Sequence, residues 1–338
     1  MSDYLLLLAP SANRVYTDAA MALTVAELSV FGTVLSGPLR DVGPTTVAGL
    51  PCVGFSAELT ERDLALLANV STVYALFLRE GELLRPVHLR PLAYFDDDLI
   101  TIPKYAGKTN EQFTQLLLNV TLLSSAWGPS MLDTPLRILD PLAGRGTTLN
   151  QALVYGYDVA GIELDSKDVE AYGAFLRTYL QRKRVKHHLE NNPVRRDRRL
   201  VARRLTASIT LPERAVSLDI VNADTTAAGD FFKPGTFHVI VGDAPYGVAH
   251  GSRTVAAGLK RSPLQLLGEA VPGWARLLRP GGALGISWNT HVARRADAAA
   301  VLSSAGLTVL DEGAYVRFEH RVDQAINRDI LVARKDPQ

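Results

Sequence analysis

Residues 138–149 read Ile138-Leu139-Asp140-Pro141-Leu142-Ala143-Gly144-Arg145-Gly146-Thr147-Thr148-Leu149 and set the fold class of the chain. The apolar residues before Asp140 predict a buried strand, and a loop of small residues leads into a helix predicted over 147–155. Small residues let a ligand approach the backbone closely, and the first turn of a helix offers unpaired N–H groups to an anion. The spacing matches neither the glycine motif of dinucleotide sites nor a P-loop. The stretch therefore predicts a site for a nucleotide-like cofactor.

Strands and helices alternate through the rest of the chain. This alternation predicts a Rossmann-like α/β fold with a mostly parallel, seven-stranded sheet over residues 136–338. Ligands of such sheets bind at the C-terminal ends of the strands, near the point where the strand order reverses. The expected strands are 136–140, 158–164, 215–221, 237–241, 283–288, 307–310 and 325–332.

The N-terminal residues 1–95 predict a smaller domain ahead of this sheet. Strands are expected at 4–9, 33–36, 46–55 and 72–78, with helices at 18–31 and 61–68. This order, βαββαβ, is that of a ferredoxin-like α+β domain. Residues 96–135 are predicted to be a connector that ends in a helix at 111–124, and this helix is expected to pack on the larger domain.

The composition of the 338 residues is that of a globular protein, and the length favours two domains. The single cysteine, Cys52, excludes a disulfide framework and a cysteine-based zinc site. No apolar run is long enough to span a bilayer, and the first residues lack the basic start of a signal peptide. We therefore expect a cytoplasmic protein without a membrane partner. The run 96–98 of three aspartates is expected to be a solvated turn, so no metal site is predicted.

Positive charge is concentrated in one segment, residues 181–214. Its first 33 residues hold ten Lys and Arg against three acids, whereas the net charge of the whole chain is +1. A block of this kind either binds nucleic acid or forms a solvated helical face. The candidate contacts to nucleic acid are Arg182, Lys183, Arg184, Arg195, Arg196, Arg198 and Arg199.

Three acids stand at the ends of successive predicted strands. Asp140 ends the first strand, Glu163 ends the second, and Asp224 follows the third. A carboxylate after the second strand suits the two hydroxyls of a ribose, because it accepts hydrogen bonds from both. Asp224 suits the amino group of an adenine. Together with the glycine loop, these acids favour a nucleoside-containing cofactor over isolated helix caps.

The sharpest functional signal is Asp243-Ala244-Pro245-Tyr246-Gly247, at the end of the fourth strand. The amino group of a nucleic-acid base is a poor nucleophile, because its lone pair is delocalised into the ring. A carboxylate and a fixed backbone carbonyl, here those of Asp243 and Ala244, can hold its N–H bonds in a more nucleophilic geometry. Pro245 makes the turn rigid, and Tyr246 can stack on the base. The turn predicts transfer chemistry on a base amino group.

These motifs resemble those of the class I S-adenosylmethionine-dependent amino-methyltransferases, whose catalytic pattern is Asp/Asn-Pro-Pro-Tyr. More narrowly, the chain is similar to the family of tRNA guanosine N2-methyltransferases that modify position 10, in which a ferredoxin-like unit precedes the methylase. The resemblance implies S-adenosylmethionine as cofactor and RNA, with tRNA favoured, as partner. It also implies that Lys108 and Thr109 close over the methionine end of the cofactor. The cofactor-binding residues implied are Lys108, Thr109, Asp140, Ala143, Gly144, Gly146, Thr147, Thr148, Glu163, Leu164, Asp224, Thr225 and Asp243, and the catalytic residues are Asp243, Ala244, Pro245 and Tyr246.

The sequence departs from this family in two ways. Ala244 stands where the family has its first proline, and residues 1–95 cannot hold both a ferredoxin-like unit and the family's THUMP RNA-binding domain. The basic segment is therefore expected to take over part of the RNA contact. Two alternatives stay open: a DNA adenine-N6 or cytosine-N4 methyltransferase with the same catalytic turn, and a non-catalytic RNA-binding relative that keeps the fold.

Overall fold

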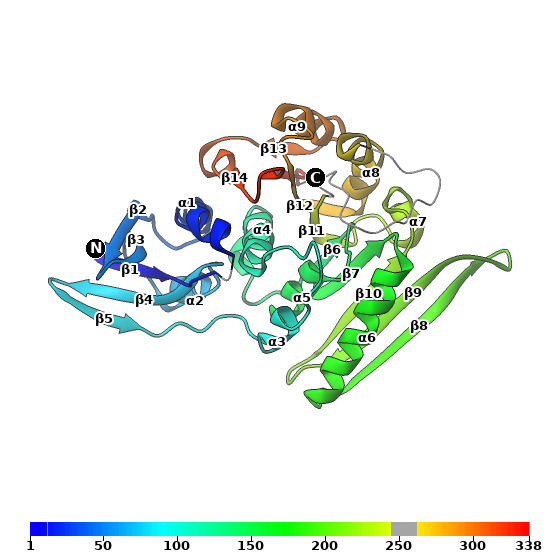
Figure 1. Cartoon of the computed structure of the whole chain (residues 1–338), viewed down its shortest axis with the longest axis horizontal. Helices are drawn as coiled ribbons and strands as arrows, with labels where there is room; N and C mark the ends of the chain where they lie inside the picture. Colours follow the sequence, from blue (N-terminus) through cyan, green and yellow to red (C-terminus); the bar gives the residue numbers. More distant parts are fainter. Residues whose placement is uncertain (12, 245–261, 338) are drawn as a thin grey trace.

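The computed structural model describes residues 1–11, 13–244 and 262–337, which fold around two β-sheets (Figure 1). The first sheet is antiparallel throughout and has the strand order β2-β3-β1-β4-β5. Apolar side chains such as Leu6, Val53 and Phe55 point from one face of this sheet into the core beneath its helices. The elements are β1 (Ser2–Leu8), α1 (Arg14–Phe31), β2 (Arg40–Val47), β3 (Leu50–Ala57), α2 (Glu61–Leu67), β4 (Val73–Glu80) and β5 (Leu83–Val87).

The order of elements in this N-terminal part follows the expected βαββαβ, with β5 added as an unpredicted fifth strand. The strand predicted at 33–36 is wrong, because the N–H groups of Thr33 and Val34 bond to carbonyls in the last turn of α1. The second strand is instead β2, which includes Gly43 and Pro44. An edge strand tolerates both residues, since one side of its backbone is unpaired. The turn of the hairpin formed by β2 and β3 is at Ala48 and Gly49, which have φ values of 50° and 80°.

The second sheet has a parallel centre in which the strand order reverses at β6 (Arg137–Asp140). β7 (Asp158–Glu163) and β10 (Ala215–Asn222) follow on one side of β6, and β11 (Phe237–Asp243) and β12 (Leu278–Asn289) on the other. β15 (Asn327–Arg334) pairs antiparallel with β12 and with β13 (Thr308–Leu310). The carboxyl ends of the five parallel strands therefore meet at one edge, on both sides of the reversal.

The prediction of a seven-stranded sheet is wrong, because the described residues form a mixed sheet of ten strands here. Two extra strands come from the basic segment, which forms the antiparallel hairpin β8 (His187–Arg196) and β9 (Arg199–Thr210) against β10. The third is β14 (His320–Arg321), which pairs with β15. β8 continues through Asn191-Asn192-Pro193, because β8 is an edge strand and edge strands tolerate proline.

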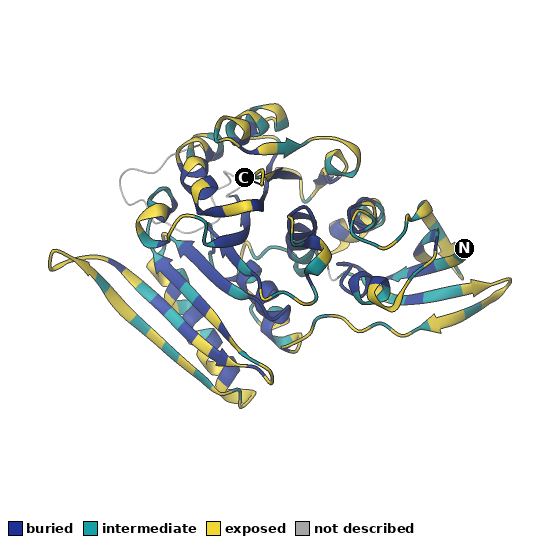
Figure 2. Ribbon diagram, turned by 180° about the vertical axis from the view of Figure 1, so that it is seen from behind, coloured by how far each residue is buried: buried dark blue, intermediate teal, exposed yellow. Residues whose placement is uncertain are grey.

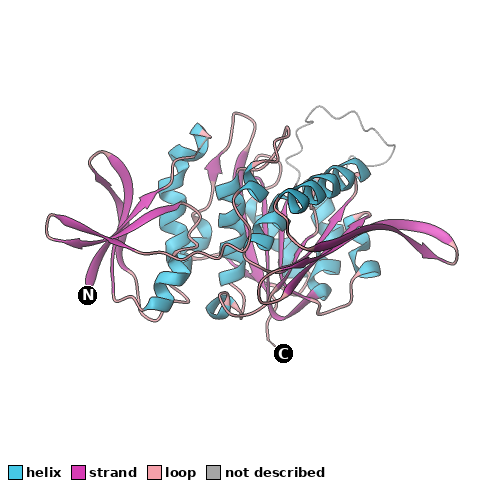
Figure 3. Cartoon of the chain, turned by 90° about the horizontal axis from the view of Figure 1, so that it is seen from below, coloured by secondary structure: helices cyan, strands magenta, loops and turns pink. Residues whose placement is uncertain are grey.

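Helices pack on both faces of the second sheet (Figure 3). Residues of β6 alternate between the two cores: Ile138 joins the core under α4, α5 and α6, and Leu139 joins the core under α8 and α9. The central strands are buried, whereas the far end of the β8–β9 hairpin is exposed (Figure 2). These helices are α4 (Glu111–Leu123), α5 (Thr147–Val154), α6 (Ser166–Arg182), α8 (Pro263–Leu277) and α9 (Arg295–Ser304).

Shorter helical pieces complete the described part of the chain: α3 (Asp98–Thr101), α7 (Ala228–Phe231), and the 3₁₀ turns η1 (Gly128–Ser130), η2 (Thr225–Ala227) and η3 (Gly313–Val316). The N-terminal sheet is joined to the second sheet by packing of α1 on α4 and on β14. Among the residues described, no helix combines the length and the apolar character needed to cross a bilayer.

Candidate active site

The glycine loop after β6 is held by the two acids that end β6 and β7. Asp140 Oδ1 accepts from the N–H of Leu142 at 2.9 Å, and Glu163 Oε2 accepts from the N–H of Gly144 at 2.7 Å. Gly146 adopts φ 79°, and a Cβ there would lie 2.5 Å from the ring of Tyr172. Only glycine fits this position, because it must combine a left-handed backbone with close contact to α6.

The loop leads into α5, and no side chain caps the first N–H groups of this helix. The N-cap of α5 is Gly146, which has no side chain to accept from the N–H groups of the first turn. Four N–H groups at the start of a helix lack intrahelical partners, and the helix dipole favours negative charge there. The hydroxyl of Thr147 pairs with that of Tyr105 at 2.7 Å, which joins the start of α5 to the segment before α4. This end of α5 is suited to a ligand carboxylate.

Asp140 is a buried acid with only 3% of its surface exposed. Burial raises the pKa of Asp140 to about 7. Hydrogen bonds from the N–H of Leu142 and the hydroxyl of Thr148 oppose this shift, because they favour the ionised form. The charges of Asp243 and Glu163 raise the pKa further. Burial also raises the pKa of Glu163. A site that gathers three carboxylates in this way favours a cationic ligand, because a cation would stabilise their ionised forms.

A cavity of about 360 Å³ opens at the carboxyl ends of β6, β7 and β11. Its lining includes three carboxylates and several aliphatic side chains, among them Leu164, which is 54% exposed. The cavity brings together five residues expected from sequence: Glu163, Leu164, Asp224, Thr225 and Asp243. The other residues that line it are Pro141, Leu142, Ile162, Ala223 and Leu266.

Asp224 and Thr225 form the wall of the cavity where β10 turns into η2. Asp224 Oδ1 caps η2 by accepting from the N–H of Thr226 at 2.9 Å and from its hydroxyl at 2.8 Å. Thr225 is buried, and its hydroxyl accepts from the indole N–H of Trp274 at 3.1 Å. Trp274 on α8 thus fixes the turn that presents Asp224.

Asp243, a predicted catalytic residue, accepts hydrogen bonds on both carboxylate oxygens. Oδ2 accepts from the hydroxyl of Thr109 at 2.6 Å, and Oδ1 accepts from the hydroxyl of Ser287, which lies opposite Asp243 in the β11–β12 pairing. The buried Ala244 continues the pairing, because its N–H donates to the Ser287 carbonyl at 2.8 Å. Pro245 and Tyr246, predicted to complete the catalytic turn, lie outside the described residues.

Sequence reasoning missed two parts of this arrangement. Ser287 stands at the end of a strand beside β11, which is the signal that would have identified it. The second part is the contact of the Thr109 hydroxyl with Asp243, which borders the cavity; the expectation that Thr109 closes over the cofactor stays a prediction. Lys108, also expected there, donates to the carbonyl of Ile100 at 2.6 Å and to Glu111 at 2.5 Å. The Lys108 ammonium is therefore engaged within the segment around α4.

The basic residues fall into two groups, which lie at opposite ends of the strands of the second sheet. Arg195, Arg196, Arg198 and Arg199 surround the hairpin tip, where Asp197 and Arg198 turn with φ 48° and 65°. Because β9 pairs Arg203 with Asn222 at the carboxyl end of β10, this tip projects from the edge that holds the cavity. The second group, Arg182, Lys183 and Arg184, lies at the end of α6, just before β8 begins. The length of β8 separates it from the tip by about 30 Å, at about 3.3 Å per residue of a strand.

Lys183 and Arg196 make contacts with other elements of the protein. Lys183 bonds to Asp98 at 2.5 Å and to Asp96 at 2.6 Å, so the aspartate run expected to be a solvated turn is instead partly ion-paired. Arg196 contacts the backbone carbonyl of Asp230 and lies over the ring of Phe231 at 5.5 Å. The latter contacts fix the hairpin tip against α7, next to η2.

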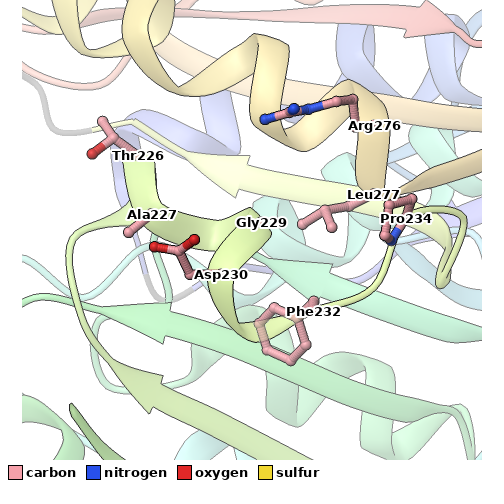
Figure 4. Close-up of a pocket in the computed structure, with 8 residues that line it drawn as sticks. All are labelled: Thr226, Ala227, Gly229, Asp230, Phe232, Pro234, Arg276 and Leu277. Atoms are coloured by element: carbon pink, nitrogen blue, oxygen red, sulfur yellow. The ribbon is translucent and has the colours of Figure 1, made fainter. Parts of the chain in front are cut away.

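A second cavity, of about 260 Å³, lies between α7 and the last turn of α8 (Figure 4). Asp230 and Arg276 are its charged residues, and Phe232 supplies apolar surface. Asp230 also faces Arg196, at 3.9 Å. Among the residues described, no group of His, Cys, Asp and Glu has the geometry of a metal site.

Comparisons with known proteins give structural likenesses alone. No protein-family model matches the sequence, and no curated protein matches it. TrmN from Thermus thermophilus is 14% identical, with 98% of this chain and 99% of that chain covered at a TM-score of 0.46. A TehB-like SAM-dependent methyltransferase from Corynebacterium glutamicum is 16% identical over 62% of this chain and 84% of that chain, at a TM-score of 0.34. The 1,6-didemethyltoxoflavin-N1-methyltransferase from Burkholderia thailandensis, solved with S-adenosylhomocysteine, is 15% identical over 69% of this chain and 94% of that chain, at a TM-score of 0.36.

The residues at the edge of the second sheet fit S-adenosylmethionine. The open start of α5 suits its carboxylate, the buried Asp140 suits its cationic end, and Glu163 suits its ribose hydroxyls. The aliphatic lining, which includes Ile162 and Leu266, suits the apolar surface of its adenine. When bound, S-adenosylmethionine supplies an electrophilic methyl group on a positively charged sulfur.

Proposed function

We propose that the protein is an S-adenosylmethionine-dependent methyltransferase that acts on the exocyclic amino group of a nucleic-acid base, with guanosine N2 in tRNA as the favoured target. The observation that carries the proposal is the fixed carboxylate of Asp243 at the border of the cofactor cavity. The hydroxyls of Thr109 and Ser287 fix the direction of this carboxylate, and a carboxylate is an acceptor for the N–H groups of an amine.

The chain's residues contribute mainly position to this reaction. Asp243 and the Ala244 carbonyl accept from the two N–H bonds of the amine, so that its lone pair points toward the methyl group. S-adenosylmethionine, held by the glycine loop and Glu163, would supply the methyl group to this lone pair, and its sulfur would keep the electrons of the carbon–sulfur bond as a neutral thioether. The proton that the nitrogen then loses goes to Asp243 or to water. Correct positioning alone supplies several orders of magnitude in rate.

RNA is the proposed partner, and the basic hairpin tip is its proposed contact. The arginines at 195, 198 and 199 are exposed and project from the same edge as Asp243. Arginine pairs with phosphate through two parallel N–H bonds, which suits an irregular RNA backbone. The group at the end of α6 lies at the other edge of the sheet and makes a smaller contribution in this proposal.

The experiment that tests the proposal has two stages. Calorimetric titration of S-adenosylmethionine into the full chain is expected to show one site per chain. Incubation with bulk tRNA, rRNA and DNA, followed by mass analysis of the nucleosides, is expected to show methylguanosine from tRNA. Methylated adenosine or cytidine from DNA would support the DNA methyltransferase instead. RNA binding without cofactor binding would support the non-catalytic relative.

The matched control pair is Asp243→Asn and Asp133→Asn. Asp133 is an exposed aspartate that pairs with Arg62 at 2.6 Å, away from the cavity. Asp243→Asn is expected to abolish transfer while cofactor affinity changes little, and Asp133→Asn is expected to leave both unchanged. Transfer at the wild-type rate by Asp243→Asn would contradict the assignment of Asp243.

A further inference from the structure

The cavity between α7 and the last turn of α8 is a neighbour of the cofactor cavity. Thr225 of η2 lines the cofactor cavity, and the next two residues, Thr226 and Ala227, line this second one. The hydrogen bond from Trp274 to Thr225 fixes η2 on α8, whose last turn also lines the second cavity. The two cavities are therefore separated by the short turn η2.

The second cavity also borders the basic hairpin tip. Asp230, which lines the cavity, has its carboxylate 3.9 Å from the guanidinium of Arg196, and its backbone carbonyl accepts a hydrogen bond from the same side chain. Arg196 also lies over the ring of Phe231, so the tip rests on α7. An RNA that contacts the tip and presents a base to Asp243 would therefore pass beside this cavity.

Two side chains of opposite charge line the cavity from different elements, Arg276 from α8 and Asp230 from α7 (Figure 4). The Arg276 guanidinium reaches toward α7, since a Cβ added at Gly229 would lie 3.8 Å from one of its nitrogens. Within the described part of the chain, no hydrogen bond or ion pair engages this guanidinium. The cavity thus offers a charged donor and a charged acceptor that are not paired with each other.

A nucleotide of RNA carries groups that match both charges. Arginine binds a phosphate through two parallel N–H bonds. A carboxylate accepts only, and the 2′-hydroxyl is the hydrogen-bond donor that the sugar–phosphate backbone of RNA offers. The apolar surface of Phe232 and Leu277 suits a base or a sugar. A phosphate alone fits less well, because Asp230 would repel it. The volume of about 260 Å³ lies just below that of small-molecule pockets, which suits one nucleoside.

We propose that this cavity binds one nucleotide of the substrate RNA other than the methylated one, with Arg276 on its phosphate and Asp230 on its ribose 2′-hydroxyl. This inference rests on the proposed function and adds to it a contact outside the reaction centre. DNA lacks the 2′-hydroxyl, so its sugar has no donor for Asp230. The cavity therefore favours RNA over DNA of the same sequence.

The first test compares Arg276→Gln with Arg177→Gln in the full chain. Arg177 is an exposed arginine on α6, which packs on the other face of the sheet, and it lines neither cavity. The probe is unmodified tRNA made by transcription. For Arg276→Gln we expect about a tenfold rise in KM for tRNA, kcat within about twofold of the wild type, and a slope of log K against log salt lower by about 0.7–0.9. Arg177→Gln should match the wild type.

Two further variants test the space and the acceptor. Gly229→Leu puts a side chain into the cavity, where the added Cβ has only Arg276 within 4 Å, and it should also raise KM several-fold. Asp230→Ala removes the acceptor. For this variant we expect the ratio of Kd for single-stranded DNA to Kd for RNA of the same sequence to fall several-fold. The ratio isolates the 2′-hydroxyl, because the loss of a negative charge affects both nucleic acids alike.

The outcomes separate this inference from the proposed function. Failure of the wild type to methylate any nucleoside would overturn the proposed function, and the inference with it. With an active wild type, an unchanged KM and salt slope in Arg276→Gln, or equal changes in Arg177→Gln, would overturn the inference alone. A wild-type KM in Gly229→Leu would do the same. An unchanged ratio in Asp230→Ala would overturn the assignment of Asp230 to the 2′-hydroxyl.

Discussion

The hydroxyl of Thr109 donates a 2.6 Å hydrogen bond to Oδ2 of Asp243, across 134 residues of sequence. This bond ties the segment before α4 to the end of β11. With Ser287 on the other oxygen, it leaves the carboxylate little freedom to rotate. In the proposed reaction, the direction of the Asp243 lone pairs sets the direction of the substrate amine.

Replacing Thr109 tests this relationship. Thr109→Val removes the donor with little change of shape, and we expect kcat to fall about tenfold, since a hydrogen bond to a charged group contributes about 1.5–3 kcal/mol. Thr109→Ser keeps the hydroxyl and is expected to stay within about threefold of the wild type. Steady-state kinetics with S-adenosylmethionine and tRNA measures both. Equal rates for the valine and serine variants would show that the bond does not orient Asp243.

The glycine loop supports a prediction about stability. Gly146→Ala puts a Cβ 2.5 Å from the Tyr172 ring at φ 79°, and we expect it to lower the free energy of unfolding by about 3 kcal/mol. Gly144→Ala is the matched control, because φ is 49° there but no atom lies within 4 Å of the added Cβ. It should cost about 1 kcal/mol, for backbone strain alone. Urea denaturation measures both, and equal losses would mean that the Tyr172 contact is unimportant.

Cofactor binding is expected to depend on pH through Asp140. Its folded pKa is about 7, and a cationic ligand favours the ionised carboxylate. The affinity for S-adenosylmethionine should therefore rise as pH increases from 6 to 8 and level off above the pKa. Asp140→Asn should bind more weakly and lose this part of the pH dependence. An unchanged pH profile in Asp140→Asn, measured by calorimetry, would assign the titration to another group.

A buried glutamate links the N-terminal part of the chain to α4. Oε1 of Glu27 accepts from the N–H of Ser71 at 3.1 Å and from the side-chain amide of Asn119 at 2.8 Å, and Oε2 accepts from the Ser71 hydroxyl at 2.6 Å. Burial raises the pKa of Glu27 to about 7, partly offset by these hydrogen bonds. Because the folded pKa is the higher one, folding binds a proton between pH 4.5 and 7, and stability falls as pH rises through this window.

Glu27→Gln should remove this loss of stability. The new amide oxygen can replace Oε1, and the NH₂ group can donate to the Ser71 hydroxyl. We expect the difference in unfolding free energy, variant minus wild type, to increase by on the order of 2–3 kcal/mol from pH 5 to pH 8. Glu61→Gln, at the exposed first turn of α2, is the control and should show no such trend. A constant difference for Glu27→Gln would mean that Glu27 does not titrate in this range.

The hairpin tip gives a prediction for RNA affinity. Replacing Arg195, Arg198 and Arg199 with Gln should weaken tRNA binding and lower the slope of log K against log salt by about 2–3, because each phosphate contact releases counterions. The control replaces three exposed arginines of the N-terminal part, Arg40, Arg79 and Arg85. Fluorescence anisotropy at several salt concentrations measures the slopes. Equal slopes for the two triple variants would show that the hairpin tip does not contact the RNA.

Much of the site was predictable because strand ends carry positional information. Asp140, Glu163, Asp224 and Asp243 follow four strands, and in a parallel sheet such residues meet at one edge. The partners of Asp243 were not predictable, because Thr109 and Ser287 reach it only through tertiary packing.

The basic segment was the largest error in the fold. Its charges left a solvated helical face as one expectation, yet residues 187–210 form a hairpin. Charged side chains and a proline are common on edge strands, where they hinder pairing with other chains. On one side of β9, Leu205, Ala207 and Ile209 are buried against the sheet. This alternation of apolar and polar residues was the strand signal that the charges obscured.

The most direct test of the central claim is transfer of a labelled methyl group from S-adenosylmethionine to unmodified tRNA, with wild type and Asp243→Asn assayed side by side and the labelled nucleoside identified by mass. We expect the wild type to label guanosine at N2 and Asp243→Asn to label nothing while still binding the cofactor. Absence of label with the wild type on tRNA, or equal labelling by the two proteins, would contradict the account.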